Sequence, residues 1–420
     1  MLKASALFYA IVVALIIALI SSSLILFSYF NRLQFQSLQL QEKVLNNASS
    51  GVNLLLASGT SFALNEKHLI DLYGDGTDSV LLERKQWGAF EIAVSKAFLK
   101  NIESIKAVQI GANIHEDPQV ALYLADQDKP LSLCGKTMIK GTCYLPKSGV
   151  KRAYIEGQNF IGDHLINGEV KESSKLLPEV NKDLLASNLG YFSKRFEIND
   201  SIISMEEQEV KDSLIHSFRD NTLLLYSDNK IILKNKYYLG NLRIVSAHSV
   251  YISADSHIQD VLIYAPTIEI EDRFSGSIQA FATDSIHIGK KCSLDYPSVI
   301  ALVRTNKSPD NIAVTIGEET AISGVLLGYQ EGINNKKQLK LAVGRDVIIK
   351  GQVYAMGHVE LKGKIFGSLT CNKFILSTPS SVYENHLLNA TIDYSGLSPH
   401  FAGVSLVNHS QSKQIVKWLY

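Results

Sequence analysis

The sequence predicts a mainly β protein with an N-terminal transmembrane helix, a mixed α+β middle domain and a C-terminal parallel β-helix. Three observations lead to this fold class. No charged residue occurs from Ala4 to Asn31, apolar residues recur every 18 residues in the second half, and the residues between mix helical with alternating patterns. With 420 residues, of which 46% are hydrophobic, the chain is long enough for two or three domains.

The uncharged N-terminal segment is long enough to cross a bilayer, which takes about 20 apolar residues in a helix. A signal peptide has a shorter apolar region and a small-residue cleavage site. Here the apolar run continues beyond Ser21-Ser22-Ser23, so we interpret residues 1–31 as an uncleaved anchor in contact with membrane lipid through residues 4–31. Lys3 and the α-amine outweigh Arg32, which predicts a single-pass protein of the cytoplasmic (inner) membrane with its N-terminus inside. The bulk of the chain is then periplasmic or otherwise extracytoplasmic.

Residues 32–64 are predicted to form a juxtamembrane helix or stalk. Leu33, Leu40, Val44 and Ala48 recur at helical spacing, and no Pro or Gly intervenes before Gly51. A helix that is apolar in its first half and amphipathic in its second resembles the N-terminus of type IV pilins and pseudopilins. That resemblance implies a subunit of a pilus-like assembly. The sequence lacks the Gly before the processed residue and the Glu at the fifth mature position that prepilins usually carry.

Residues 65–220 are predicted to form a mixed α+β domain. The spacing of apolar side chains predicts a helix over 80–101 and strands over 107–112 and 119–126. The acidic, glycine-containing run 71–78 does not match the EF-hand loop and predicts a tight turn. Residues 141–177 are rich in turns and predict successive short strands. Residues 183–220 predict a polar connector with one or two helices.

The chain has four cysteines. Cys134 and Cys143 enclose a short loop with two glycines, which predicts a disulfide in an oxidising compartment. Two unrelated buried thiols are the alternative. No further thiol or histidine is close enough in sequence for a zinc site. Cys292 and Cys371 are isolated and predicted to be core residues.

The clearest repeat lies in residues 221–381. Val/Ile-x-Ile pairs end at Ile252, Ile270 and Ile288, a constant spacing of 18 residues. Val245, Ile263 and Phe281 repeat with the same period. A constant period with apolar residues at alternate positions indicates one stacked unit per repeat, and 18 residues suit one coil of a parallel β-helix. Further coils follow through Ile316, with loops predicted at 304–310 and 330–337.

The stretch VIIKGQVYAMGHVELKGKIFGSLTCNKFIL, residues 347–376, combines Val/Ile doublets with glycine-containing corners. It resembles the bactofilin, or polymer-forming cytoskeletal, family over residues 239–376. The resemblance implies a right-handed β-helix, no cofactor, no catalysis and end-to-end association. Bactofilins are compact, whereas this chain has a large preceding domain and insertions at Arg304 and Gln330. The remaining residues, 382–420, are predicted to form a C-terminal tail that caps the last coil.

The composition and motifs exclude several classes of function. Lys+Arg and Asp+Glu both number 41, so no excess of basic charge predicts nucleic-acid binding. No hydrolase, nucleotide-loop or zinc-protease motif occurs, and His248 and His257 are predicted to face solvent. We therefore predict no catalytic, cofactor-binding or metal-binding residues and no enzyme activity.

Two functions remain open from the sequence. The first is a structural or scaffold protein of a bacterial cell envelope, with protein partners in an envelope or pilus-like assembly and homo-oligomerisation left open. The alternative is a carbohydrate-binding or carbohydrate-active β-helix. Aligned acids and stacked aromatics along one face of the coils would favour the alternative. The predicted outward positions Tyr251, Glu269 and His287 are chemically mixed and favour the first.

Overall fold

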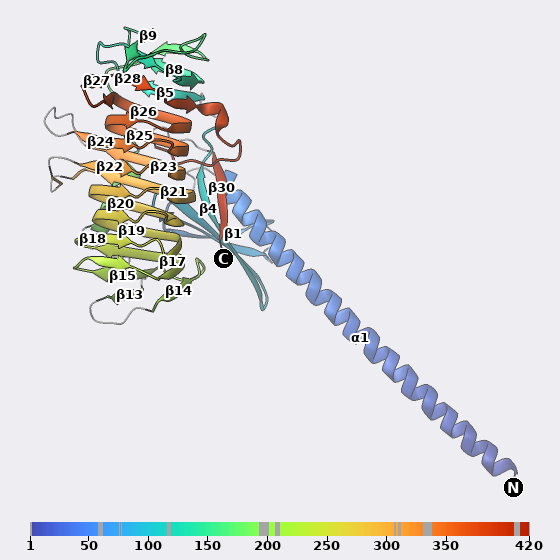
Figure 1. Ribbon diagram of the computed structural model, residues 1–420. Coiled ribbons are helices and arrows are strands. Elements are labelled where there is room, and N and C mark those ends of the chain that lie inside the picture. The colour runs from blue at the N-terminus through green and yellow to red at the C-terminus, as the bar shows by residue number, and fades with distance from the viewer. Residues whose placement is uncertain are drawn as a thin grey trace. The chain divides into compact units, whose positions relative to one another are not determined.

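The computed structural model describes residues 2–57, 62–74, 76, 78–115, 119–192, 201–205, 211–305, 308–309, 312–330, 338–406 and 412–419. They form a mainly β structure with one long N-terminal helix (Figure 1). The chain divides into two compact units. The first comprises Met1–Leu55, Glu66–Glu83 and Val94–Lys106, and the second comprises Leu56–Asn65, Arg84–Ala93 and Ala107–Tyr420.

In the first unit, helix α1 (Leu2–Ala57) is continuous and is long and apolar enough to cross a membrane. At 1.5 Å per residue, its 56 residues extend over about 84 Å. None of its most apolar window is buried inside the protein. The predicted juxtamembrane helix is therefore the direct continuation of the apolar segment up to Ala57, and the predicted stalk residues 58–61 lie outside the described residues.

The last turns of α1 pack against an antiparallel hairpin. Strand β1 (Lys67–Asp71) pairs with Ser79–Glu83 of β2 (Ser79–Trp87). Val44, Ala48 and Val52 of the helix are buried, as are residues of β2. A Cβ added to Gly51 would lie 2.2 Å from Ser95 Oγ, so only glycine permits this close approach of helix and sheet.

The predicted tight turn lies between β1 and β2 and is described at residues 71–74, 76 and 78. The Asp71 carboxylate accepts hydrogen bonds from the backbone N–H groups of Tyr73, Gly74 and Gly76, at 3.2, 2.9 and 2.7 Å. Asp78 is fully buried and forms an ion pair with Lys43 at 2.6 Å. The Asp71 carboxylate thus stabilises the turn, and the Asp78 carboxylate contacts the helix. Among the described residues no cluster of three metal-ligating side chains occurs.

The helix predicted over 80–101 is wrong. These residues form β2 and β3 (Phe90–Leu99), joined by a turn at Gly88, whose φ is +60°. Val80, Leu82 and Arg84 are buried at every second position, which is the period of a strand. The aromatic residues at 87, 90 and 98 also fit a helical stripe, but a glycine with positive φ between them breaks any helix.

β2, β3 and β4 (Ile102–Ala112) contribute residues to both units. In the second unit, Ala107–Ala112 of β4 pairs antiparallel with the C-terminal strand β30 (Lys413–Leu419). Strand order in the antiparallel sheet is β1-β2-β3-β4-β30. The predicted strand over 107–112 is confirmed.

The remainder of the second unit is a stack of parallel strands that forms one sheet closed on itself. Its strands up to α2 are β5 (Val120–Leu124), β7 (Met138–Lys140), β8 (Thr142–Leu145) and β12 (Val170–Glu172). Two smaller sheets lie outside it: the hairpin β10 (Tyr154–Ile155) and β11 (Gln158–Asn159), and a three-stranded sheet of β6 (Leu131–Cys134), β9 (Val150–Arg152) and β28 (His386–Leu388). After helix α2 (Lys182–Phe192) the stack continues with β13 (Ser201–Ser204), β14 (Ser213–His216), β15 (Leu223–Ser227), β16 (Ile231–Leu233), β17 (Tyr237–Ser246), β18 (Ser249–Ile252), β19 (His257–Ile270), β20 (Ser275–Ile288), β21 (Ser293–Val303), β22 (Ala313–Ile316), β23 (Ala321–Tyr329), β24 (Leu339–Val343), β25 (Ile348–Leu361), β26 (Lys364–Ser377), β27 (Val382–Glu384) and β29 (Thr391–Asp393), before the 3-10 helix η1 (Tyr394–Gly396).

The strand pairs fall into three columns. One column runs through β13, β15, β17, β19, β20, β21, β23, β25, β26, β5, β8 and β12. A second runs from β16 through β18 to β26, and a third from β14 through β17 to β26, β29 and β7. Because β19, β20, β25 and β26 belong to all three columns, each long strand bends around the core (Figure 1).

The order in which the chain builds this stack differs from the order of its coils. Residues 120–172, assigned from sequence to the middle domain, form the coils beyond β26. The chain then returns through α2 and winds from β13 up to β26. There Leu369 of β26 pairs with Leu122 of β5, and Lys364 pairs with Thr391 of β29. One coil is therefore completed by two segments that are far apart in sequence.

The prediction that residues 382–420 only cover the last coil is incomplete. β29 pairs with β26 and β7, so residues 391–393 are part of the stack, whereas β28 pairs with β6 in the separate three-stranded sheet. β27 pairs antiparallel with the end of β26. The final strand leaves the stack and pairs with β4. The edge of β26 is therefore occupied by β5 as well as by strands of the tail.

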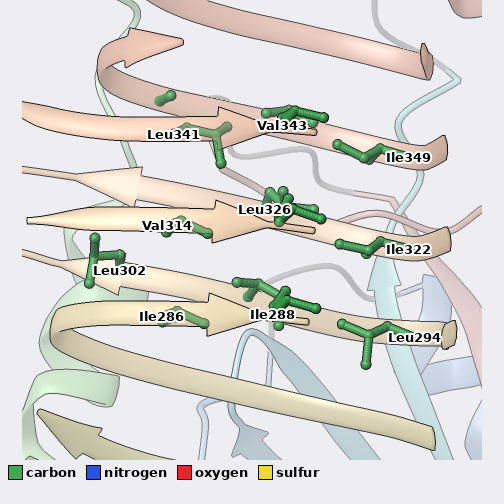
Figure 2. Packing of buried hydrophobic residues seen from close by; sticks show 14 of the residues in the cluster. Ile286, Ile288, Leu294, Leu302, Val314, Ile322, Leu326, Leu341, Val343 and Ile349 are labelled. Carbon is green, nitrogen blue, oxygen red and sulfur yellow. The ribbon is translucent and has the colours of Figure 1, made fainter. Parts of the chain in front are cut away.

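The 18-residue repeat is confirmed. Ile252 pairs with Ile270, and Ile270 with Ile288, and each is at most 1% exposed. Ile288 pairs with Ile316 across the predicted longer interval. Figure 2 shows the same stacking further along, with Ile286, Val314 and Leu341 on successive strands. The predicted loop residues 306–307, 310 and 331–337 lie outside the described residues.

The second predicted repeat, Val245, Ile263 and Phe281, is out of register by one residue. Val245 pairs with Tyr264, and Tyr264 with Phe281, whereas Ile263 pairs with Ala280. The register changes after Gln259, next to Asp260, which has a φ of +59°. A bulge at this corner lengthens one coil, so a fixed period of 18 fails on that side of the stack.

Candidate functional site

A cleft of about 190 Å³, lined by both polar and apolar residues, lies in the second unit. β2, β3, β4 and β30 provide one side, and the first turns of α2 and residues 403–405 provide others. Ala112 and Gly403 exchange backbone hydrogen bonds of 2.8 and 3.0 Å, which anchors the 403–405 segment to β4. The non-regular segment 403–405 is therefore held beside the strands of the cleft by backbone hydrogen bonds.

The cleft contains a cluster of three charged side chains, Arg84, Glu91 and Lys413. Arg84 of β2 donates to Glu91 of β3 through Nε at 3.0 Å and through a terminal nitrogen at 2.8 Å. Lys413 of β30 contacts the other oxygen of Glu91 at 2.9 Å. The side chains of Arg84, Glu91 and Lys413 are only 4, 13 and 11% exposed. Two cations thus share one carboxylate in a poorly hydrated place, which leaves a local excess of one positive charge.

Helix α2 forms another wall of the cleft. Asn181 caps the helix, because its side-chain oxygen accepts from the backbone N–H groups of Asp183 and Leu184 at 3.0 and 3.3 Å. Asn188 fixes the helix on the stack: its side chain donates to Gly88 O at 2.9 Å and accepts from Tyr264 OH at 2.8 Å. Leu184 is consequently buried against the cleft, while Asp183 lies at its exposed rim.

The cleft also contains hydrogen-bond donors that the protein does not use. Ser405 Oγ is shielded from solvent and has no hydrogen-bond partner. Lys413 has three N–H donors and makes one contact with Glu91. Phe90 and Ile110 provide apolar surface beside these groups. Such an arrangement can hold a small anionic group against an apolar floor.

The disulfide predicted between Cys134 and Cys143 is not formed: all four cysteines are free and buried. Cys134 packs in a small cluster with Ile155 and Leu376, whereas Cys143 belongs to the main core. They lie on different strands, β6 and β8, which belong to different sheets. Burial raises the pKa of Cys143 to about 12 and that of Cys371 further, so both are protonated thiols. Cys292 and Cys371 are core residues, as predicted.

The predicted outward row of the stack is in register. Tyr251 pairs with Glu269, Glu269 with His287, and His287 with Thr315. His287 Nδ1 lies 2.7 Å from Thr315 Oγ1. His248 and His257 are exposed, as predicted, and the ring of His257 stacks on Tyr237. The row combines one aromatic residue, one acid and one imidazole, so it has neither the stacked aromatics nor the aligned acids expected of a carbohydrate site.

Sequence reasoning missed the charged cleft. Arg84 and Glu91 fall in the segment predicted as a helix, 80–101, and Lys413 falls in the predicted tail, 382–420. The alternation of Val80, Leu82 and Arg84 is a signal that could have placed Arg84 on a buried face. No local pattern connects Glu91 with Lys413, because they are separated by 322 positions and meet only through β30.

No family model, curated protein or solved structure matches this chain. The resemblances to bactofilins and to type IV pilins therefore stay predictions from the sequence.

Proposed function

We propose that this chain is a non-catalytic, single-pass scaffold protein of the cell envelope, anchored in the cytoplasmic membrane with its folded part outside. The observation that carries the proposal is the unbroken helix α1, which combines a fully exposed apolar segment with a packed C-terminal end. The folded part of the chain that packs on Val44–Val52 is then held within one helix length of the membrane. We further propose that the parallel stack is a right-handed β-helix, a shape well suited to a rigid spacer.

The proposed topology is tested with reporters fused after Lys417, which lies in the last described strand. Alkaline phosphatase, which folds only outside the cytoplasm, should be active there, and a cytoplasm-dependent fluorescent reporter should be dark. The reverse result would place the folded part inside and refute the proposal. Fractionation with and without carbonate washing separates an uncleaved anchor, which stays in the membrane, from a processed signal sequence, which releases the chain.

A role in an envelope or pilus-like assembly is supported by the exposed apolar side chains of α1 beyond the predicted membrane segment, including Phe35 at 62% and Leu38 at 56% exposure. A photo-crosslinking residue at position 35 should trap protein partners in intact cells. Crosslinks to lipid only would argue against an assembly role. The same residue at exposed position 290 of the stack serves as the control.

The carbohydrate-binding alternative is tested on the outward row. The purified wild-type protein and a variant with Tyr251 and Glu269 replaced by Ala should migrate equally on polysaccharide affinity gels. Retention that depends on these two residues would favour the alternative.

A further inference from the structure

The cleft described above has features of a binding site that the scaffold role does not use, and the inference does not rest on that role. Arg84, Glu91 and Lys413 belong to three strands, and Lys413 is the last of them in the chain. A structural ion pair needs one cation for Glu91. Arg84 already binds it twice, at 3.0 and 2.8 Å, so Lys413 adds a second cation where burial makes its charge costly.

The three charged side chains line the cleft together with a hydroxyl group that has no hydrogen-bond partner. Lys413 and Ser405 both line the cleft, and the Ser405 hydroxyl is buried without a hydrogen-bond partner. Buried hydroxyl groups in proteins are normally hydrogen-bonded. An anionic oxygen placed in the cleft would accept from Lys413 Nζ and Ser405 Oγ, and Arg84 would add its charge from behind Glu91.

The remaining walls restrict the ligand further. Phe90, Ile110 and Leu184 present apolar surface, so the ligand carries a short apolar part. A volume of about 190 Å³ is below the range of pockets for drug-sized ligands, which start near 300 Å³. Asp183 at the rim disfavours a second negative charge. We infer that the cleft binds a small organic monocarboxylate, with its carboxylate on Lys413 and Ser405 and its apolar part on the floor.

The carboxylate could belong to a free small molecule or to the carboxyl terminus of a peptide. We therefore test the full-length chain in non-ionic detergent micelles with sodium benzoate and propionate, and with a short peptide in free-acid and amidated forms. Binding is followed by titration calorimetry, with empty micelles as the blank. Saturable binding of benzoate or propionate identifies a free acid, and binding of the free-acid peptide alone identifies a chain terminus. Benzamide, which has the shape of benzoate without its charge, should bind at least about tenfold more weakly.

The variants separate this site from general charge effects. Lys413→Gln should weaken binding by about tenfold or more, and Ser405→Ala by a few-fold. Asp183→Asn should tighten binding, because it removes a repulsive charge at the rim. Lys417→Gln is the matched control: Lys417 is on the same strand and pairs with Asp260 at 2.6 Å, outside the cleft. It should leave binding unchanged.

Lys413→Gln also removes an ion pair, so folding is checked by melting temperature, and Lys413→Arg is included to retain the positive charge. Arg at this position should restore most of the binding. The inference is overturned if no carboxylate binds the wild-type chain, if benzamide equals benzoate, or if Lys413→Gln and Lys417→Gln weaken binding equally. None of these results depends on the membrane topology, which is tested separately.

Discussion

At the scale of single residues, the stack alternates between side chains that must be buried and side chains that are free to vary. Ile270 is 1% exposed between Ile252 and Ile288, whereas its neighbour Glu269 faces outward. Adjacent positions of one strand point to opposite faces. Substitutions one residue apart should therefore have very different effects on stability.

Replacing Ile270 with Asp should cost several kcal/mol of unfolding free energy, because an unpaired carboxylate would lie between two apolar layers. Replacing Glu269 with Ala should cost less than about 0.5 kcal/mol. Denaturant unfolding of the detergent-solubilised chain measures both. Similar losses at the two positions would contradict the half-buried strand.

His358 should make stability depend on pH near neutrality. Burial lowers its pKa from the reference value of 6.5, and the charges of Lys373 and Lys340 lower it further, while Glu384 opposes them. The unfolded chain therefore binds this proton more readily, so stability is complete above pH 6.5 and falls as the pH drops towards the folded pKa. His358→Gln should lose less stability than wild type between pH 7 and 5.5, measured by denaturant midpoints. An equal loss would show that other groups dominate.

At the scale of elements, the corners of the stack depend on a column of glycines. Gly324, Gly351 and Gly367 pair in register, and their φ angles are +146, +144 and +141°. A Cβ at Gly351 would lie 1.9 Å from the carbonyl oxygen of Gly324. Backbone in this region with such close contact tolerates no side chain.

Gly351→Ala should consequently destabilise the chain by more than about 1 kcal/mol, through strain rather than loss of burial. Lys350→Ala is the control, because Lys350 is exposed one residue earlier. Thermal melting compares the two variants. A melting temperature for Gly351→Ala equal to that of Lys350→Ala would show that the corner adjusts without strain.

At the scale of the whole molecule, the stack is completed where β26 meets β5. Cys371 of β26 pairs with Leu124, and Leu122 of β5 pairs with Cys143 of β8. Residues from the first and last parts of the second unit therefore share one core. Forming such contacts late in the chain requires closing a very long loop, which favours slow folding.

Cys143 and Cys371 provide a direct test of this shared core. Both are buried thiols with raised pKa values, so a maleimide should not label either in the native chain at pH 7. In a denaturant series, both should become labelled at the same concentration, as shown by mass spectrometry of the peptides. Labelling of Cys143 at a clearly lower concentration would show that residues 120–172 unfold independently.

The sequence alone determined the features that depend on local pattern. The apolar helix, the 18-residue repeat of Ile252, Ile270 and Ile288, and the turn at Asp71 follow from the order of neighbouring residues, because burial on one face imposes a period. The hairpin of β2 and β3 was missed, since its aromatic residues fit both periods, and the turn at Gly88 and the alternation of Val80, Leu82 and Arg84 decide between them.

Only the tertiary structure decided which distant segments meet. The pairing of β5 with β26, the separation of Cys134 from Cys143 and the contact of Glu91 with Lys413 each join residues whose local sequences carry no mark of the partner. A strand edge accepts any complementary strand, and an ion pair any opposite charge, so these contacts are selected by how the whole second unit closes. The repeat could be predicted because its period is a local property, whereas the cleft depends on where the last strand is placed.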